Sequence, residues 1–562
     1  MRFATLAATY VQFETLSGNA LRHELAAFLT KVPASDIKAV SYMTLGTIAS
    51  DFDDVNLGLA GKMALRAVAI AYDKDEARVI ADAKKKGDVG LAAEAAAKDV
   101  KPTLSVFDVF ETLHRIAATS GTGSQDEKIR LFSDLLRKAT ALEARYIARL
   151  AVGQLRLGLA SKTILDGLSK ALGINKADIE HAFNICPDIG IIAETAVKGQ
   201  AAIKEIGVMA GRPVQMMLCQ RVKSMQEALD KLGTPVAAEQ KYDGERVQIH
   251  KDGKKVTLYS RRLENITHQF PDIVRTVSQV KARSCIIEGE IMAVGKKGEL
   301  VAFQTLMSRR RKHGVEQMAK EIPVRVFCFE LLFLNGKSLL REPYTTRYEN
   351  LRAIIKPSAG IDFAQRVICE DARCIDALFK RVVGKGGEGV VVKSLRHDSD
   401  YQAGVRGWHW VKWKPEYSKG LQDTFDLVVI GAFWGRGRRS GLYGAVLCAA
   451  YNKKQDRFES FCKVGSGFSD VELAALPKKL VKAGGKPNNV DVTKQMTPDV
   501  WIEPTKVIEV LAAEITKSPF HMAGWKDGKG LALRFPRFVG WREDKKPEQA
   551  TSVEEIVRMS AR

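Results

Sequence analysis

Lys241 opens a short cluster of charged residues, KYDGER, that ends at Arg246. A lysine becomes a covalent nucleophile when its ammonium loses a proton, which burial or a nearby cation favours. Asp243 and Glu245 place negative charge nearby, and the guanidinium of Arg246 offers a fork that suits a phosphate. These residue types favour chemistry on a phosphate. A K-x-D-G string also arises by chance in solvated turns, so its meaning depends on the clusters that follow.

The residues after Arg246 alternate between apolar and polar types, stop at Asp252-Gly253, and alternate again through Val256 and Leu258. An Asp-Gly pair between two runs of period two is a strong hairpin signal. The pattern predicts a β-hairpin directly after the cluster. Lys241 should then lie in the loop before the hairpin, where a side chain can be directed into a cleft.

Further polar residues recur at the edges of predicted strands. Arg261 follows the hairpin. Glu288 and Glu290 are separated by one glycine, so strand alternation puts both carboxylates on one face, where they can hold Mg²⁺ or a ribose hydroxyl. Phe329 lies in another apolar strand, where it is either a core residue or a platform on which a base stacks.

The last clusters lie between Glu388 and Lys414. Glu388 and Lys393 stand at the two ends of one predicted strand. Arg406 precedes an aromatic-rich run in which Lys412 and Lys414 share a face. Each cluster also has a purely structural explanation, such as a solvated strand face or, for Lys393, protection of a sheet edge. Their occurrence together in one order is what demands a functional explanation.

The chain has 562 residues, which predicts two to four domains, each large enough for its own core. Its formal net charge of +21 favours a polyanionic partner, most simply nucleic acid, although a generally basic surface has the same charge. No apolar run approaches the roughly 20 residues that span a bilayer, and the first residues lack a signal-peptide pattern. We therefore expect a cytoplasmic protein that is neither secreted nor bound to a membrane.

The eight cysteines are scattered, and no two form a C-x-x-C pair. Cys369 and Cys374 are the closest two, and no His or Cys cluster completes a zinc site around them. In a chain of this length, we interpret all eight as reduced and mostly buried thiols.

Residues 1–210 are predicted to form an all-α domain. Apolar residues recur there at helical spacing, and Ser161 is the expected N-cap of one helix. A Gly- and Ser-rich connection at 120–125, together with scattered basic residues, has the composition to grip a phosphate backbone without reading bases. The apolar positions include Leu131, Leu135, Leu142, Tyr146 and Leu150, and the basic ones include Lys128, Arg130, Arg137, Lys138, Arg145 and Arg149.

Two further domains follow. Residues 211–417 show short alternating or apolar runs, for example 286–294, 324–334 and 390–393, which predict an α+β domain with antiparallel sheets. Residues 418–562 contain strands at about 427–433, 443–451 and 458–464, separated by Gly-rich turns. We expect these to form an OB-fold β-barrel with a mobile basic loop at 434–441.

In this order the clusters resemble the motifs of the covalent nucleotidyltransferase superfamily, which contains ATP-dependent DNA ligases and mRNA-capping enzymes. The resemblance is to the ligases of the archaeal and eukaryotic replicative type, and it covers nearly the whole chain. The strings LRFPRF at 533–538 and REDK at 542–545 are similar to the C-terminal motif of these ligases. The strings QLRLG at 154–158 and GRPV at 211–214 also resemble them, whereas Glu330 stands where the family usually has Asp.

The resemblance implies that Lys241 attacks the α-phosphate of ATP and carries AMP on its side-chain nitrogen. The AMP then passes to a 5′-phosphate at a nick in duplex DNA, and the adjoining 3′-hydroxyl displaces it. Such an enzyme serves DNA replication, repair and recombination, and through them cell division. It works at the nucleoid as a monomer, with a sliding clamp as a further partner.

The family's site residues are carried over position by position. Glu290 and Glu388 are the implied ligands of Mg²⁺, with Mn²⁺ as an alternative ion. The nucleotide site is implied to consist of Glu239, Arg246, Arg261, Glu290, Phe329, Arg406 and Lys412. Other motif positions are Asp243, Gly244, Lys393 and Lys414 around the nucleophile, and Arg534, Arg537, Asp544 and Lys545, which act in pyrophosphate departure.

Two other functions fit part of this pattern. RNA ligases and capping guanylyltransferases share the covalent lysine, but they usually lack a helical domain of the length seen at 1–210. An inactive, basic nucleic-acid-binding scaffold is the non-enzymatic alternative. Against the scaffold, each expected catalytic position holds a chemically competent residue.

Overall fold

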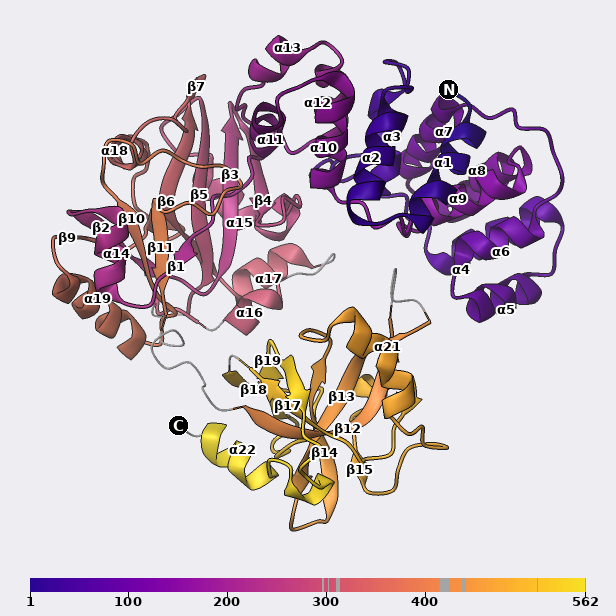
Figure 1. The fold of residues 1–562 in the computed structure, drawn as a ribbon. Coiled ribbons are helices and arrows are strands. Elements are labelled where there is room, and N and C mark those ends of the chain that lie inside the picture. The colour runs from indigo at the N-terminus through magenta and orange to yellow at the C-terminus, as the bar shows by residue number, and fades with distance from the viewer. Residues whose placement is uncertain are drawn as a thin grey trace. The chain divides into compact units, whose positions relative to one another are not determined.

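The structure is a computed structural model that describes residues 1–295, 298–301, 303–309, 314–414, 424–435, 441–512 and 514–560. It divides into two compact units, Met1–Lys414 and Pro415–Arg562. Figure 1 shows a helical region at the start of the first unit, followed by a region of β-sheets, and a second unit dominated by strands.

The first 204 residues contain thirteen described helices and no described strand. Their apolar faces meet in one continuous core, in which Leu131, Leu135, Tyr146 and Leu150 are buried as the helical spacing predicts. The helices are α1 (Phe3–Thr15), α2 (Gly18–Leu29), α3 (Ile37–Leu45), α4 (Gly61–Tyr72), α5 (Glu76–Lys86), α6 (Val89–Ala96), α7 (Val106–Ala118), α8 (Ser124–Arg137), α9 (Ala141–Ala151), α10 (Ser161–Leu172), α11 (Lys176–Ile185), α12 (Ile189–Ala196) and α13 (Gln200–Lys204).

The expected N-cap of α10 is wrong. Ala160, whose backbone is extended, occupies the cap position without a side-chain hydrogen bond, and Ser161 is already the first helical residue. Side-chain caps do begin other helices, for instance the capping boxes of Ser105 at α7 and Thr140 at α9.

The basic residues that we expected to grip a phosphate backbone are mostly engaged within the helical region. Lys128 donates to the Leu57 carbonyl at 2.7 Å. The arginine partners are Glu127 for Arg130, Asp134 for Arg137, Glu14 for Arg145 and Asp88 for Arg149. Lys128, Arg145 and Arg149 are largely buried in the packing of the helices, whereas Arg130 and Arg137 form exposed ion pairs along α8.

Two sheets form the remainder of the first unit. The first has the order β1-β11-β10-β2-β9 and the second the order β4-β3-β5-β6-β7, with β8 beside β6. Apart from β1 with β11 and β6 with β8, the neighbouring strands are antiparallel, as predicted. The strands are β1 (Gln220–Arg221), β2 (Val236–Lys241), β3 (Glu245–Asp252), β4 (Lys255–Ser260), β5 (Ser284–Ala293), β6 (Val324–Leu334), β7 (Lys337–Ser338), β8 (Ile361–Phe363), β9 (Arg366–Cys369), β10 (Gly389–Ser394) and β11 (Trp410–Trp413).

Helices pack against both sheets. The apolar faces of α15 and α18 join the second sheet in a shared core, and α19 contacts β2, β9 and β10 of the first sheet. The helices are α14 (Met225–Leu232), α15 (Pro271–Val277), α16 (Phe303–Met307), α17 (Val315–Glu321), α18 (Tyr344–Ile354) and α19 (Ala372–Gly384).

The predicted hairpin is confirmed as β3 and β4, with Asp252 opposite Lys255 and Gly253 in the left-handed region at φ +56°. Lys241, however, is the last residue of β2 and not a loop residue. The chain leaves the first sheet at Lys241 and enters the second at Glu245. The charged cluster therefore spans the crossing between the two sheets.

The second unit is rich in strands. Its main sheet has the order β15-β14-β13-β12-β17-β20, with β16 beside β12, and β18 pairs with β19. The three predicted strands correspond to β12, β13 and β14, while closure into an OB-fold barrel stays a prediction. The elements are β12 (Phe425–Trp434), β13 (Tyr443–Asn452), β14 (Arg457–Val464), β15 (Val490–Asp491), β16 (Val500–Trp501), β17 (Val507–Leu511), β18 (Glu514–Ser518), β19 (Gly530–Arg534), β20 (Arg537–Trp541), α21 (Asp470–Lys479) and α22 (Val553–Ser560).

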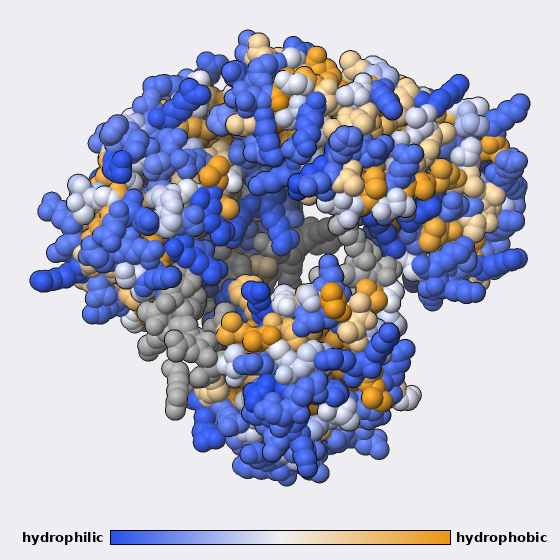
Figure 2. Space-filling model, in the orientation of Figure 1, coloured by the Kyte–Doolittle hydropathy of each residue, from blue (hydrophilic) through white to orange (hydrophobic). Residues whose placement is uncertain are grey.

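Most of the basic loop expected at 434–441 lies outside the described residues. In the part of the chain that is described, no helix is both long enough and apolar enough to cross a bilayer. Figure 2 shows hydrophilic residues over most of the visible surface, as the charge excess predicts.

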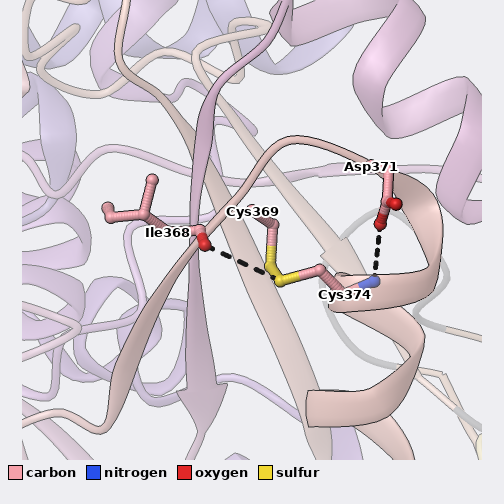
Figure 3. Close-up of a disulfide and its surroundings, with 4 residues drawn as sticks. All are labelled: Ile368, Cys369, Asp371 and Cys374. Atoms are coloured by element: carbon pink, nitrogen blue, oxygen red, sulfur yellow. Dashed lines mark hydrogen bonds between the residues drawn. A yellow bond between two sulfur atoms is a disulfide. The ribbon is translucent and has the colours of Figure 1, made fainter.

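Cys369 and Cys374 form a disulfide, so the expectation of reduced thiols is wrong for this pair (Figure 3). Cys369 ends β9 and Cys374 lies in the first turn of α19, and their Cα atoms are 5.4 Å apart. Asp371 caps α19 by accepting from the Cys374 N–H at 2.8 Å, and the chain reversal at this cap brings the two thiols together. The other six cysteines are free.

Candidate active site

Three adjacent strands bring Lys241, Glu388 and Lys414 together. Gly389 on β10 is the register partner of Lys241 on β2, and Val390 is the partner of Trp413 on β11. Glu388 immediately precedes β10, and its two carboxylate oxygens each contact an ammonium, Oε2 that of Lys241 and Oε1 that of Lys414. All three side chains remain partly exposed. The carboxylate therefore faces two lysines that are 173 positions apart by their sequence numbers.

Gly389 makes this approach possible. Its φ is +138°, and a Cβ atom built on it lies only 2.3 Å from the Trp413 carbonyl oxygen. A side chain at this position would push β10 and β11 apart, and the ends that carry Glu388 and Lys414 would separate.

Lys412 lies on β11, where Val391 of β10 and Arg221 of β1 are its register partners. Burial lowers the pKa of Lys412 below its usual value, and the positive charge of Lys241 lowers it further. The expectation that Lys412 and Lys414 share a face fits the structure, since both are partly exposed whereas Trp413 between them is buried against Phe379 of α19.

Glu290 lies on β5 beside the crossing between the sheets. Its Oε1 accepts from the Gly244 N–H at 3.2 Å. Burial raises the pKa of Glu290 to about 7, although Lys241 and Arg246 act in the opposite direction. A Cβ atom at Gly244 would lie 2.3 Å from the Ile291 carbonyl oxygen, so only glycine lets the backbone come this close to β5.

Arg246, on β3, is held by two acceptors. Its Nη1 donates to the Met217 carbonyl at 2.9 Å and its Nη2 to Glu288 Oε2 at 2.8 Å. The guanidinium carbon lies 5.6 Å from the centre of the Phe329 ring and 5.7 Å from that of Trp410. The charge of Glu288 raises the pKa of Arg246 in spite of the opposing effect of burial, so the group is a permanent cation.

Glu288 and Glu290 lie on one face of β5, as the alternation predicted, since their register partners Gln248 and Arg246 alternate along β3. The two carboxylates nevertheless take separate roles. Glu288 is fully buried and accepts three hydrogen bonds, whereas Glu290 keeps some exposure. Glu290 is therefore the carboxylate of this strand that remains available to a ligand.

Glu239 and Lys393 form a buried ion pair across β2 and β10, with 2.9 Å between Nζ and Oε2. Lys393 also donates to the Phe329 carbonyl at 2.9 Å, and the Tyr344 hydroxyl donates to the second oxygen of Glu239. Since β10 lies in the middle of its sheet, protection of a sheet edge is not the role of Lys393. Its contacts hold the backbone of Phe329 and the side chain of Glu239.

Phe329 is neither a core residue nor fully exposed. Its ring meets Trp410 edge-on at 6.3 Å, and the Lys393 ammonium lies 4.9 Å from its centre. The neighbouring Glu330, which replaces the usual Asp, makes a bidentate pair with Arg347 at 2.8 and 2.9 Å, and both side chains are fully buried. Arg347 thus satisfies both carboxylate oxygens of the glutamate at this position.

Arg261 and Arg406 belong to the edge of this region. Arg261 follows β4, and the pairing of Ser260 with Val247 puts it at the same end of the sheet as Arg246. Its side chain is exposed and lines a cavity of about 350 Å³ together with residues of α3 and α10. Arg406 is exposed, and its positive charge lowers the pKa of Lys412 after the larger effect of burial.

The predicted C-terminal residues belong to the second unit. Arg534 of β19 pairs with Glu514 of β18 at 2.6 Å, and Arg537 is an exposed residue of β20. Asp544 accepts from Arg542 at 2.7 Å, which lowers the pKa of Asp544 to about 2, and Lys545 pairs with Asp426 at 2.5 Å. Asp243, in the first unit, is exposed.

The sequence interpretation missed several residues around Arg246. Gln248, His250 and Tyr401 are all buried. Gln248 and Tyr401 both donate to Glu288, and His250 bonds to Gln248. Gln248 and His250 alternate with Arg246 along β3, and this period of two was the available signal. Tyr401 has no such signal, because it comes from a distant loop.

Three family models match the chain: the DNA ligase N terminus over residues 2–169, the ATP dependent DNA ligase domain over 216–414 and the ATP dependent DNA ligase C terminal region over 439–545. The chain is 42% identical over 572 residues to DNA ligase 1 of Methanosarcina mazei, with 99% of both chains covered. It is 42% identical over 561 residues to the DNA ligase of Caldivirga maquilingensis, with 95% of this chain and 93% of that one covered.

A solved structure titled Pmar-Lig_Pre. has a similar fold, with a TM-score of 0.55 at 18% identity over 96% of this chain and 99% of that one. The three family models together reach from near the first residue to position 545, and the relatives match along nearly the full length. The chain belongs to the ATP-dependent DNA ligase family.

Proposed function

An ATP-dependent DNA ligase seals nicks in duplex DNA, and we propose that this chain does so through a covalent AMP on Lys241. The observation that carries the proposal is the position of the Lys241 ammonium, at the end of β2, facing the carboxylate of Glu388 beside Lys414. The amine is partly exposed, and the same carboxylate holds the Lys414 ammonium, a group that can bind phosphate. An amine so placed can act on a nucleotide as soon as it loses one proton.

In the first step Lys241 Nζ forms a bond to the α-phosphorus of ATP. The bond from that phosphorus to the bridging oxygen breaks, and pyrophosphate leaves with the electron pair. The proton of the ammonium goes to solvent or to Glu388, whose Oε2 contacts it. Lys412 and Lys414 offset the negative charge that grows on the phosphate oxygens, and their fixed positions require little reorganisation.

The rest of the nucleotide needs a platform and polar partners. Phe329, fixed by Lys393 and flanked by Arg246, supplies a partly exposed ring on which adenine stacks. Glu290 accepts from a ribose hydroxyl, and Glu239 completes the nucleotide pocket from β2. Arg406 and Arg261 reach the phosphates from the edge.

In the later steps AMP moves from Lys241 to the 5′-phosphate at a nick. The 3′-hydroxyl oxygen then bonds to that phosphorus, and AMP leaves with the electrons of the broken bond. The net charge of +21 supports a DNA partner that is held mainly through its phosphates. We propose a three-part organisation, with residues 1–210 for DNA binding, 211–417 for adenylation and an OB-fold at 418–562.

The side chains fit a divalent ion. Glu290 and Glu388 offer hard oxygen ligands, and the raised pKa of Glu290 marks a buried carboxylate that a cation would stabilise. Bound there, Mg²⁺ or Mn²⁺ would supply positive charge for the phosphates. Among the described residues no three His, Cys, Asp or Glu side chains cluster as a complete metal site, so phosphate oxygens and water would provide the other ligands.

We assign the four C-terminal residues, Arg534, Arg537, Asp544 and Lys545, to pyrophosphate departure. The similarity of their segment to the ligase C-terminal motif supports this assignment. We further propose that the protein acts as a monomer at the nucleoid, with a sliding clamp as a partner, on the strength of the family membership.

The decisive experiment follows the label from ATP that is radioactive at the α-phosphate. The protein should acquire an acid-stable label, pass it to nicked duplex on addition of DNA, and release it as AMP when the nick is sealed. Lys241→Ala should acquire none, and an undiminished label on this variant would refute the assignment. A parallel incubation with labelled GTP separates a ligase from a capping guanylyltransferase, which would take its label from GTP.

A further inference from the structure

Arg246 is fixed by a set of buried polar side chains that do not belong to the nucleotide pocket. Its two terminal nitrogens are used by the Met217 carbonyl and by Glu288, and within the described residues its buried Nε has no hydrogen-bond partner. The guanidinium carbon also lies close to the ring centres of both Phe329 and Trp410, at 5.6 and 5.7 Å. Its direction thus depends on one carbonyl and one carboxylate.

Glu288 is itself fixed from three sides. Oε2 accepts from Arg246, while Oε1 accepts from Gln248 Nε2 at 3.1 Å and from the Tyr401 hydroxyl at 2.9 Å. Glu288 and Gln248 are fully buried, and Tyr401 is almost so. A buried carboxylate with three donors has little freedom to move, because each lost hydrogen bond would leave a buried polar group unsatisfied.

Gln248 connects this carboxylate to the linker that joins the helical region to the sheets. Its Oε1 accepts from the Val214 N–H at 2.7 Å, and its Nε2 donates to the Val214 carbonyl at 3.1 Å. His250 continues the set, because its Nε2 lies 2.9 Å from Gln248 Oε1 and its Nδ1 accepts from the Gly211 N–H at 3.1 Å.

The hydrogen bonds of this set have one direction. His250 must be neutral with its proton on Nε2, since Nδ1 accepts from a backbone amide and burial lowers the pKa of His250 to about 3. The donors then run from Gly211 to His250, from His250 to Gln248 and from Gln248 to Glu288. Arg246 donates into the same carboxylate from the other side.

From this geometry we propose that Glu288 is a positioning residue, held by Gln248 and Tyr401, that sets the guanidinium of Arg246 for the nucleotide. The proposal rests on the proposed function, in which Arg246 binds the nucleotide. Glu288 does not touch the nucleotide and acts only through Arg246.

The test compares Glu288→Gln with a matched control, Asp272→Asn. Asp272 also pairs with a buried arginine, Arg309, at 2.9 Å through both terminal nitrogens, and none of these contacts belongs to the site. Both variants remove one carboxylate charge from an arginine pair. The rate of labelling by ATP at saturation, corrected for the folded fraction, should fall about tenfold in Glu288→Gln and less than about twofold in Asp272→Asn.

The same comparison is repeated in an Arg246→Ala background, because a residue that acts only through Arg246 loses its effect when the guanidinium is gone. There Glu288→Gln should change the labelling rate by less than about twofold. Equal loss in Glu288→Gln and Asp272→Asn, or a tenfold loss that persists without Arg246, would overturn the proposal.

If Glu288→Gln does not fold, the milder variant Tyr401→Phe provides the test. Tyr401→Phe removes the donor to Glu288 and the acceptor of the Met217 N–H, and it keeps the ring that meets Trp410 edge-on. It should slow labelling about threefold. An unchanged rate in Tyr401→Phe would count against the proposal. A displaced Arg246 guanidinium in a crystal structure of either variant would support it without any activity measurement. Loss of labelling in wild type and control alike would instead overturn the proposed function.

Discussion

Lys241 and Glu388 face each other at the ends of neighbouring strands, with the ammonium of one against the carboxylate of the other, although 147 positions separate them. The same carboxylate contacts Lys414 from the strand on its far side. One acid thus lies between the proposed nucleophile and a second cation. Loss of the acid would leave two positive charges without a common counter-charge.

Glu388→Gln should slow the labelling of Lys241 by roughly 10- to 100-fold at saturating ATP, because the amide can neither take the proton nor supply a full charge to a metal ion. Rapid-quench measurement of the labelled protein gives the rate. Glu316→Gln is the control, since Glu316 forms an exposed pair with Arg275 and its loss should not alter labelling. A wild-type rate in Glu388→Gln would exclude it from the first step.

Glu290 should make the protein without metal or nucleotide less stable as the pH rises. Its pKa is raised from 4.5 to about 7, so the folded protein binds the proton more tightly than the unfolded chain does. The contribution of Glu290 is therefore fully present below pH 4.5 and is lost as the pH rises toward 7.

Glu290→Gln mimics the protonated acid and tests this sign. At pH 8 the variant should be more stable than wild type, by at most roughly 3 kcal/mol, and at about pH 4 the two should be equal. Urea unfolding at both values provides the comparison. A variant that is less stable at pH 8 would show that the carboxylate is charged and well compensated. Glu290→Gln should also lose labelling activity, as a functional carboxylate often costs stability.

Lys393→Met should destabilise the protein by about 3–5 kcal/mol, because Glu239 would remain buried with its charge uncompensated. The double variant Lys393→Met with Glu239→Gln removes both charges and should recover part of the loss. Urea unfolding of wild type, the single variants and the double variant gives the coupling energy. Additive losses would indicate that the two side chains do not interact in solution.

Nick sealing and the labelling of Lys241 should respond differently to the salt concentration. Sealing of a nick depends on many contacts to DNA phosphates, and its apparent affinity should fall steeply between about 50 and 200 mM salt. Labelling of Lys241 by ATP uses only a few, partly buried charges and should change far less over the same range. If both steps show the same salt dependence, the basic surface is not the DNA-binding element.

The disulfide between Cys369 and Cys374 predicts a thiol count. After unfolding without a reductant, alkylation should modify the six free cysteines, and after reduction it should modify eight. Intact-mass measurement distinguishes these results. Eight modified cysteines without reduction would show that the pair is reduced in the protein as isolated.

The local order of residues was sufficient to predict secondary structure, buried helix faces and the family of this protein. The alternation around Asp252-Gly253 predicted β3 and β4, because a turn dipeptide and side-chain period act within a few residues. The apolar spacing at Leu131 to Leu150 predicted buried helical faces for the same reason. The motifs also identified the family, because their order along the chain can be read from the sequence without knowing how far apart they lie in space.

Only the tertiary structure decided how those residues are used. The alternation correctly predicted one shared face for Glu288 and Glu290, but only the fold brought Tyr401 from a distant loop to Glu288, which pairs with Arg246, and left Glu290 for a ligand. For Lys393 the sequence left open a role in protecting a sheet edge, which the strand order excludes because β10 lies inside its sheet. Hydrogen bonds and burial depend on which strands become neighbours, and that choice is made by packing over the whole chain rather than by adjacent residues.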